Sequence, residues 1–328
     1  MILATLAALW TTAYSFSPGV AHTYDVKVTF DGFLPVLGGN EGKAEIKMGV
    51  KVEGAQAPAG RTAATNEITA FEISFNGAKL PLTVDNVTDY FPRSHLVIEP
   101  TGKLVSNDAP DKKLPVRLPG LDVRRLPDIT YVPIEFSTTA TALEDAWKFQ
   151  RDFGGTPMDY QCIAVGEEDG LVKVKVEVRQ EYTVLENDSL EVVTERSSAV
   201  REVTTVLEGK GFVLFDQELG MARKAVMSNL ATSRAKDLKD GTVGVRKLKT
   251  DYEVVLGSPR VKKAAAKPWW DQARDTAVLV RNNPRAMVGM LQLAAMMGMQ
   301  KLPVAWTNVL RPIESQLRRW LPGYVRQG

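Results

Sequence analysis

Residues 172–182 read VKVKVEVRQEY, and this stretch decides the fold class. Valine or tyrosine occupies positions 172, 174, 176, 178 and 182, whereas every odd position from 173 to 181 is charged. Because successive side chains of an extended strand point to opposite faces, this alternation predicts a strand with one dry and one wet face. A slip of one residue would expose every valine, so the pairing register of this strand is strongly specified.

The same two-residue period continues on both sides of this stretch. The pattern predicts further strands at 24–30, 43–53, 68–75, 95–99, 104–106, 147–153, 158–165, 200–207, 212–215, 221–227 and 243–256. Turn signals such as Asp169-Gly170 and Asp240-Gly241 separate many of them, and no long helical period lies between them. These features predict antiparallel pairing and exclude a parallel α/β fold.

Strands with one dry face need a cover. The cover can be a second sheet, a helix, or the same sheet curling around a ligand cavity. The length of the strand at 170–184 favours the curled arrangement. The sequence therefore predicts a mainly β protein with one or more large curved antiparallel sheets, or a half-barrel, followed by a C-terminal helical tail.

The charge is distributed unevenly along the chain. Residues 260–328 hold 12 Lys and Arg against 3 Asp and Glu, a net charge of +9, and the rest of the chain carries −7 because the total is +2. We expect a β body at 22–257, with a possible internal boundary in the Pro-, Asp- and Lys-rich loop 107–130. A linker at 258–267 and a basic helical tail at 268–328 would follow.

The amino terminus has the composition of a secretory signal peptide. Residues 1–24 contain no Lys, Arg, Asp or Glu, and an apolar run from Ile2 to Ala13 precedes small residues that end at Ala21. This pattern predicts a signal peptide at 1–21 and export to the periplasm or the extracellular space. A non-cleaved anchor is the alternative, although a membrane-spanning helix needs about 20 apolar residues.

The chain has one cysteine, Cys162, so an intrachain disulfide cannot form. Because Cys162 lies on the apolar side of a predicted strand, it is expected to be a buried small hydrophobe. The chain has only two histidines, His22 and His95, which excludes a His-rich zinc site. No Gly-x-Ser-x-Gly motif occurs. The sequence thus predicts no catalytic residue and no cofactor.

One metal hypothesis depends on the cleavage site. If the chain is cut after Ala21, His22 becomes the first residue, and a terminal amine plus its imidazole chelates copper well. His95 would be the sole candidate for a third nitrogen ligand. This arrangement resembles the histidine brace of lytic polysaccharide monooxygenases and of periplasmic copper carriers, which implies copper-dependent catalysis or copper transport as one alternative function.

The end of the basic tail has the pattern of an amphipathic helix. Apolar and aromatic residues fall on one side and arginines mostly on the other, a pattern that suits a membrane interface or a partner protein. The candidate contact residues are Trp306, Ile313, Leu317, Arg318, Arg319 and Trp320. A helix that packs on its own sheet has the same pattern, so that alternative stays open.

Two short patterns carry a resemblance. They are Val132-Pro133-Ile134 leading to Glu144-Asp145-x-Trp147, and Gly209-x-Gly211-x-x-x-Phe215-Asp216-x-x-x-x-Gly220. The region of about 130–256 resembles uncharacterised secreted bacterial β-sheet proteins, and its outline is similar to lipoprotein carriers with an open β-barrel. The resemblance implies a fold and includes no catalytic motif.

These features together predict an exported, non-enzymatic binding or envelope-associated protein. Its curved body would hold an apolar ligand or a partner, and the basic tail would dock it to a membrane or a partner. No feature predicts nucleic-acid binding. The alternatives are the copper protein described above and a structural component whose tail packs on its own body.

Overall fold

The computed structural model describes residues 9–35, 39–79, 84–88, 91–109, 131–137, 140–152 and 156–257. Within them, one 13-stranded antiparallel sheet dominates the fold. The elements are β1 (Leu9–Thr11), β2 (Ala21–Leu34), β3 (Asn40–Ala55), β4 (Thr62–Phe75), β5 (Ala78–Lys79), α1 (Val84–Thr88), β6 (Ser94–Ile98), β7 (Leu104–Asn107), β8 (Ala140–Ala142), β9 (Ala146–Asp152), β10 (Pro157–Glu168), β11 (Leu171–Glu186), β12 (Val192–Val193), β13 (Arg201–Asp216), β14 (Met221–Asp237) and β15 (Val243–Leu256).

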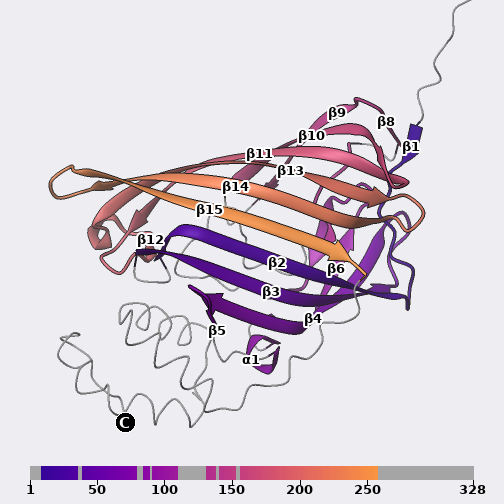
Figure 1. The fold of residues 1–328 in the computed structure, drawn as a ribbon, viewed down its shortest axis with the longest axis horizontal. Coiled ribbons are helices and arrows are strands. Elements are labelled where there is room, and N and C mark those ends of the chain that lie inside the picture. The colour runs from indigo at the N-terminus through magenta and orange to yellow at the C-terminus, as the bar shows by residue number, and fades with distance from the viewer. Residues whose placement is uncertain are drawn as a thin grey trace, which may run out of the picture.

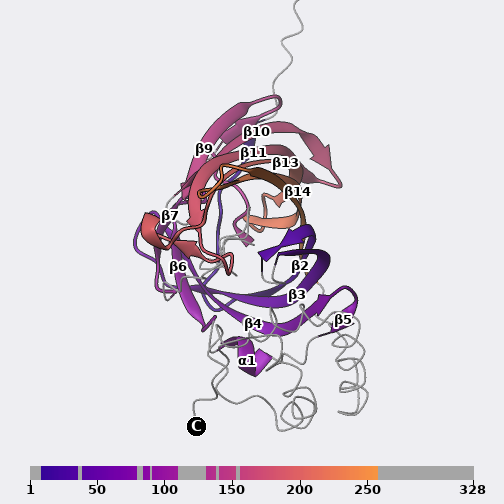
Figure 2. The ribbon, with the colours of Figure 1, turned by 90° about the vertical axis from the view of Figure 1, so that its left-hand side faces the viewer.

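The sheet is open and strongly curved. Its strand order is β7-β6-β4-β3-β2-β15-β14-β13-β11-β10-β9, with β5 beside β4 and β12 beside β11, and β1 pairs separately with β8. The long strands run side by side in Figure 1. The end-on view in Figure 2 shows the sheet curling, with β9 and β7 as the two edges of the path. The predicted mainly β, curved antiparallel fold is confirmed.

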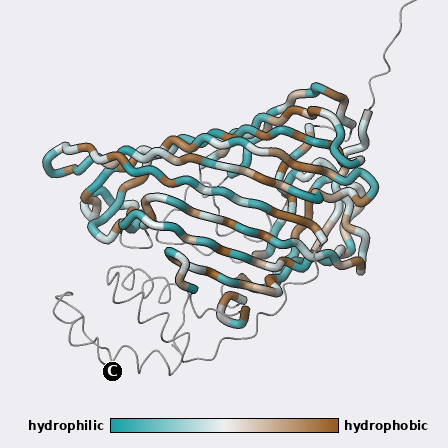
Figure 3. The backbone as a smooth tube through the Cα atoms, viewed as in Figure 1, coloured by the Kyte–Doolittle hydropathy of each residue, from teal (hydrophilic) through white to brown (hydrophobic). Residues whose placement is uncertain are grey.

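Strand β11, which contains residues 172–182, has the one buried and one exposed face that its sequence predicts. Asp169 and Gly170 form the two-residue turn between β10 and β11, and their φ values of 53° and 76° are positive, as this kind of hairpin turn requires. In β11 the valines from Val172 to Val178 are buried, whereas Lys175 on the opposite face is exposed. Figure 3 shows the same alternation of apolar and polar residues along the other long strands. We call the buried side of the sheet the inner face.

Several predicted strands were too short, among them β4, which begins at Thr62 and not at Ile68, and the clearest cases are β13 and β14. Strands were expected at 200–207 and 212–215, but β13 runs without a break through Gly209 and Gly211. Strand β14 continues ten residues beyond the predicted end at Met227. The reason is the same in both cases: glycine, alanine and asparagine occupy inward positions there, so the apolar alternation is weak although the backbone pairing continues.

Gly211 allows a close approach of β14 to β13. A Cβ atom at Gly211 would lie 1.9 Å from the carbonyl oxygen of Val226 and 2.6 Å from the sulfur of Met227. We therefore expect Gly211→Ala to lower the free energy of unfolding by about 1–3 kcal/mol, measured by urea denaturation. Gly244→Ala is the matched control, since its strand position has open space around it. Equal stability of the two variants would contradict the close packing at Gly211.

An aromatic cluster closes one end of the inner face. We call residues 10–16 and 131–136 the plug, because they carry buried side chains that pack inside the curve of the sheet. Tyr14 and Phe136 both meet the ring of Phe215 edge to face, at centroid distances of 5.2 and 5.0 Å. The Tyr14 hydroxyl donates to the carbonyl of Ile134 at 3.0 Å. The two chain segments of the plug are thus in direct contact.

The plug includes part of the predicted signal peptide. Trp10, Tyr14 and Phe16 are 7%, 2% and 6% exposed. The backbone N–H groups of Tyr14 and Ser15 donate to Pro100 and Gly220. Cleavage after Ala21 stays a prediction. A chain cut there would lose these three buried side chains from its core.

Several predicted features lie outside the described residues, namely most of the loop 107–130, the linker 258–267 and the helical tail 268–328. Within the part of the chain that is described, no helix has the length and apolar character to cross a membrane.

Candidate functional site: the inner face of the curved sheet

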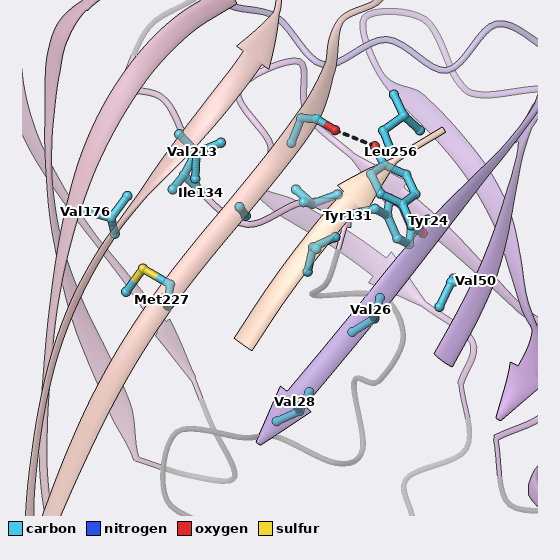
Figure 4. Packing of buried hydrophobic residues seen from close by; sticks show 14 of the residues in the cluster. Tyr24, Val26, Val28, Val50, Tyr131, Ile134, Val176, Val213, Met227 and Leu256 are labelled. Atoms are coloured by element: carbon cyan, nitrogen blue, oxygen red, sulfur yellow. Dashed lines mark hydrogen bonds between the residues drawn. The ribbon is translucent and has the colours of Figure 1, made fainter. Parts of the chain in front are cut away.

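The inner face is a mainly apolar surface that extends along the long strands. Side chains from every second position of six neighbouring strands line it: Tyr160, Cys162 and Ala164 on β10; Val174, Val176 and Val178 on β11; Leu207 and Val213 on β13; Ala225, Met227 and Ala231 on β14; Leu248 and Val254 on β15; Val26, Val28 and Phe30 on β2. Figure 4 shows Val26, Val28 and Met227 directed toward the same interior as Tyr131 and Ile134 of the plug.

The plug meets this surface at one end. Among the described residues, the partners in its ring contacts and hydrogen bonds include Tyr24, Thr62, Asn66, Trp147 and Phe215. None of these contacts reaches Leu207, Asn229 or Leu248, farther along the strands. The apolar surface therefore extends beyond the region that the plug holds.

Asn229 is one of several buried polar residues on this surface, together with Gln180, Thr205 and Thr250. It lies on β14 between Met227 and Ala231, opposite Gly209, and is only 4% exposed. Its Oδ1 packs over Gly209, at 1.9 Å from where a Cβ would stand, and accepts no hydrogen bond. A buried polar atom without a partner is rare and costs about 1–3 kcal/mol. Its neighbour in the register, Thr250, is 3% exposed.

A buried ion pair lies where the plug meets the edge strand β9. Arg151 Nε donates to Glu135 at 2.9 Å, with side-chain exposures of 9% and 13%, and Arg151 also donates to the carbonyl of Val132 at 2.7 Å. The guanidinium lies 5.4 and 5.8 Å from the ring centroids of Phe149 and Tyr160, which stack on each other. This pair ties the plug to the edge of the sheet.

Tyr160, Cys162 and Tyr252 are held in their neutral forms. Burial raises the pKa of the Tyr160 hydroxyl and of the Cys162 thiol to about 12, and Arg151 opposes both shifts. Burial, reinforced by Tyr160, likewise raises the pKa of Tyr252. Since a thiolate is the reactive form of cysteine, Cys162 is an inert core residue at neutral pH, as the sequence predicts.

The sequence matches no protein-family model and no curated protein. Among solved structures, the chain is similar to a lipovitellin structure titled for lipid–protein interactions, with 14% identity and a TM-score of 0.43. The match covers 93% of this chain and 35% of that one, so the chain spans about a third of its length.

The structure does not bring the two histidines together. His22 is opposite Val52 on β3, Val52 is opposite Asn66 on β4, and Asn66 is opposite Ser94 on β6. His95, the next residue, therefore faces the other side of the sheet from His22. At about 4.8 Å per strand, the two are also roughly 14 Å apart across the sheet. Among the described residues, no group of three or more His, Cys, Asp or Glu is arranged so that it could hold a metal ion.

The tail residues predicted to contact a membrane or partner (Trp306, Ile313, Leu317, Arg318, Arg319 and Trp320) lie outside the described residues. Their role stays a prediction.

A large surface depression lies among the described residues. This open groove of about 1080 Å³ crosses the strands from β9 to β15, and its lining is mainly exposed and charged, which places it on the outer face. Lys148, Arg179, Lys210 and Lys249 alternate there with Asp159, Glu177 and Glu208. Such mixed, solvated charges favour no particular ligand. A void of only about 40 Å³ lies at the far end of the inner face, beside Tyr182 and Arg246.

Sequence reasoning missed Arg151, Glu135 and Asn229. A usable signal existed for two of them. Arg151 lies two residues after Phe149, on the same side of its strand as Trp147 and Phe149. Asn229 likewise lies on the same side of its strand as Ala225 and Met227. A polar residue in the dry phase of a strand indicates either a satisfied internal contact or a ligand contact, because burying it alone is costly.

Proposed function

We propose that the protein is a binding protein that holds an apolar or amphiphilic ligand against the inner face of its curved sheet. The observation that carries the proposal is the apolar inner face itself, which continues beyond the plug and has an unpartnered amide oxygen, that of Asn229, within it. Apolar surfaces with a few well-placed polar groups are typical of small-molecule sites.

The chemistry of this surface suggests the class of ligand. Valine, leucine, methionine and phenylalanine side chains bind an alkyl chain or a ring system by excluding water. The Asn229 carboxamide supplies an acceptor and two donors for one polar group of the ligand. A single-chain lipid with a hydroxyl or carboxyl group has this combination. The alternative occupant is the chain itself, from its residues outside the described ranges.

Asn229→Val tests the proposal. Without ligand, we expect the free energy of unfolding to rise by about 1 kcal/mol, because an unsatisfied buried polar group is removed. Binding of a dansyl-labelled fatty acid, followed by fluorescence and competition with oleate, is expected to weaken about fivefold to tenfold, because one hydrogen bond to the ligand is lost.

Asn66→Val is the matched control. Asn66 is also a buried asparagine on the inner face, but it donates to Tyr131 and accepts from Ser94. We expect this variant to lose about 1–3 kcal/mol of stability and to keep its affinity for the fatty acid. No saturable fluorescence with the wild-type chain would refute the proposed function and favour an interior filled by the protein itself.

Export and docking by the basic tail form part of the proposal and are supported by the sequence alone. Co-sedimentation with liposomes of the full chain and of a chain that ends before residue 260 tests the tail. Equal binding by both chains would exclude the tail as the membrane anchor.

A further inference from the structure

The hairpin of β14 and β15 has an exposed outer face of unusual composition. Residues 230–249 contain six Lys and Arg against two Asp, although residues 1–259 as a whole carry a net charge of −7. Leu230, Val243 and Val245 are 48%, 53% and 61% exposed, so this hairpin holds the two most exposed large apolar side chains of the described residues. In Figure 1 its tip projects beyond β2 and β3.

The register gathers these side chains on one face. Val243 is opposite Lys236, Val245 is opposite Arg234, and Leu230 is opposite Lys249. All six point away from the inner face, since the residues between them, Ala235 among them, face inward. We call Leu230, Arg234, Lys236, Lys239, Val243, Val245 and Lys247 the hairpin patch; Lys239 lies in the turn that connects the two strands.

The charges of the patch are available to a partner. Among the described residues, Arg234, Lys236, Lys239 and Lys247 are exposed and form no ion pair with an acidic side chain. The two acidic residues beside or in the turn accept hydrogen bonds from other residues of the turn. Asp237 accepts from the N–H of Lys239, and Asp240 accepts from the N–H and hydroxyl of Thr242.

The opposite face of the hairpin is fixed to the body. Arg246 pairs with Glu186 at 2.7 Å, with exposures of 14% and 10%, and its guanidinium lies 4.5 Å from the ring centroid of Phe33. Strand β2 pairs with β15 only from Leu248 onward. The base of the hairpin is therefore attached to the body, whereas no described strand other than β14 pairs with β15 between Val243 and Lys247.

We propose that the hairpin patch docks the protein on an anionic lipid surface. Basic residues that surround exposed aliphatic side chains suit the membrane interface, where cations meet anionic headgroups and apolar groups enter the acyl boundary. The exposed valines favour lipid over an acidic protein, because a purely electrostatic contact has no use for them. This surface is distinct from the inner face, so the proposal does not depend on ligand binding there.

Co-sedimentation of the full chain tests the proposal, with vesicles of phosphatidylcholine alone and of an equimolar mixture with phosphatidylglycerol. We expect binding to the anionic vesicles only. Raising NaCl from about 0.1 M to about 1 M should weaken it strongly, because the Debye length falls from roughly 10 Å to roughly 3 Å. Lys236→Glu with Lys247→Glu is expected to reduce the affinity about tenfold or more.

Two further variants separate the contributions. Val243→Thr with Val245→Thr keeps the charge and the strand preference and is expected to weaken binding by about fivefold. Lys148→Glu with Lys175→Glu makes the same charge change at exposed positions elsewhere on the sheet and should leave binding unchanged. Equal losses in both charge-reversal variants, or no binding by the wild-type chain, would overturn the proposal. Tight binding of soluble polyglutamate, with the same affinity for the wild type and for the valine variant, would indicate an acidic protein partner and would also overturn the proposal.

Discussion

Glu135→Gln is expected to lower the free energy of unfolding by about 3–5 kcal/mol, since the charge of Arg151 would then be buried without its partner. The pair spans the junction between the plug and the edge strand β9, with a 2.9 Å contact and little exposure of either side chain. Urea denaturation of the two proteins measures the difference. The loss arises from uncompensated burial of a charge, so it should be much larger than the loss of an ordinary hydrogen bond.

A second substitution identifies the cause of this loss. In the Glu135→Gln background, Arg151→Met removes the unpaired charge and keeps an apolar side chain against Phe149 and Tyr160, so we expect most of the stability to return. Arg179→Gln is the control on the outer face. Arg179 is paired at 3.9 Å with Glu181 and with Glu208 but is largely exposed, and its loss should cost less than about 1 kcal/mol. Equal effects of Glu135→Gln and Arg179→Gln would show that the inner pair is not effectively buried.

A chain that begins at His22 is expected to show no cooperative thermal unfolding transition. Such a chain lacks Trp10, Tyr14 and Phe16, and the loss of one large buried aromatic side chain costs about 3–5 kcal/mol. The sum reaches the whole stability of a typical protein, about 5–15 kcal/mol. Circular dichroism during heating measures the transition, and the fluorescence of a dye that binds exposed apolar surface would rise.

Point variants make the same test without truncation. Tyr14→Ala should lower the free energy of unfolding by about 3–5 kcal/mol, whereas Ser17→Ala, at an exposed position of the same segment, should change it by less than about 0.5 kcal/mol. An unchanged melting temperature in the chain that begins at His22 would contradict the packing of the plug. The mass of the protein from its native source shows directly whether residues 9–20 are retained.

The strands were predictable from the sequence because side-chain alternation is a local property. Val172 to Val178 define a face without reference to the rest of the chain, and Asp169-Gly170 marks the turn that sets their pairing. The prediction stopped short where inward positions hold small or polar residues, as at Gly209, Gly211 and Asn229. There the sheet continues through pairing with its neighbours, which no local pattern reveals.

The candidate site could be predicted only in outline. An apolar interior follows from the alternation, but the plug joins residues more than a hundred positions apart, such as Tyr14 and Ile134. The separation of His22 from His95 likewise depends on the strand order β2-β3-β4-β6. The composition of residues 9–20 does not distinguish a signal peptide from a buried segment, because the same apolar composition suits both.

Native mass spectrometry of the full chain, purified without detergent, tests the central claim that the inner face holds a ligand. We predict a bound small molecule that adds mass to the native protein, disappears after organic extraction, and is replaced by added oleate. A protein that carries no bound mass, and that takes up neither oleate nor the dansyl-labelled fatty acid after extraction, would contradict it.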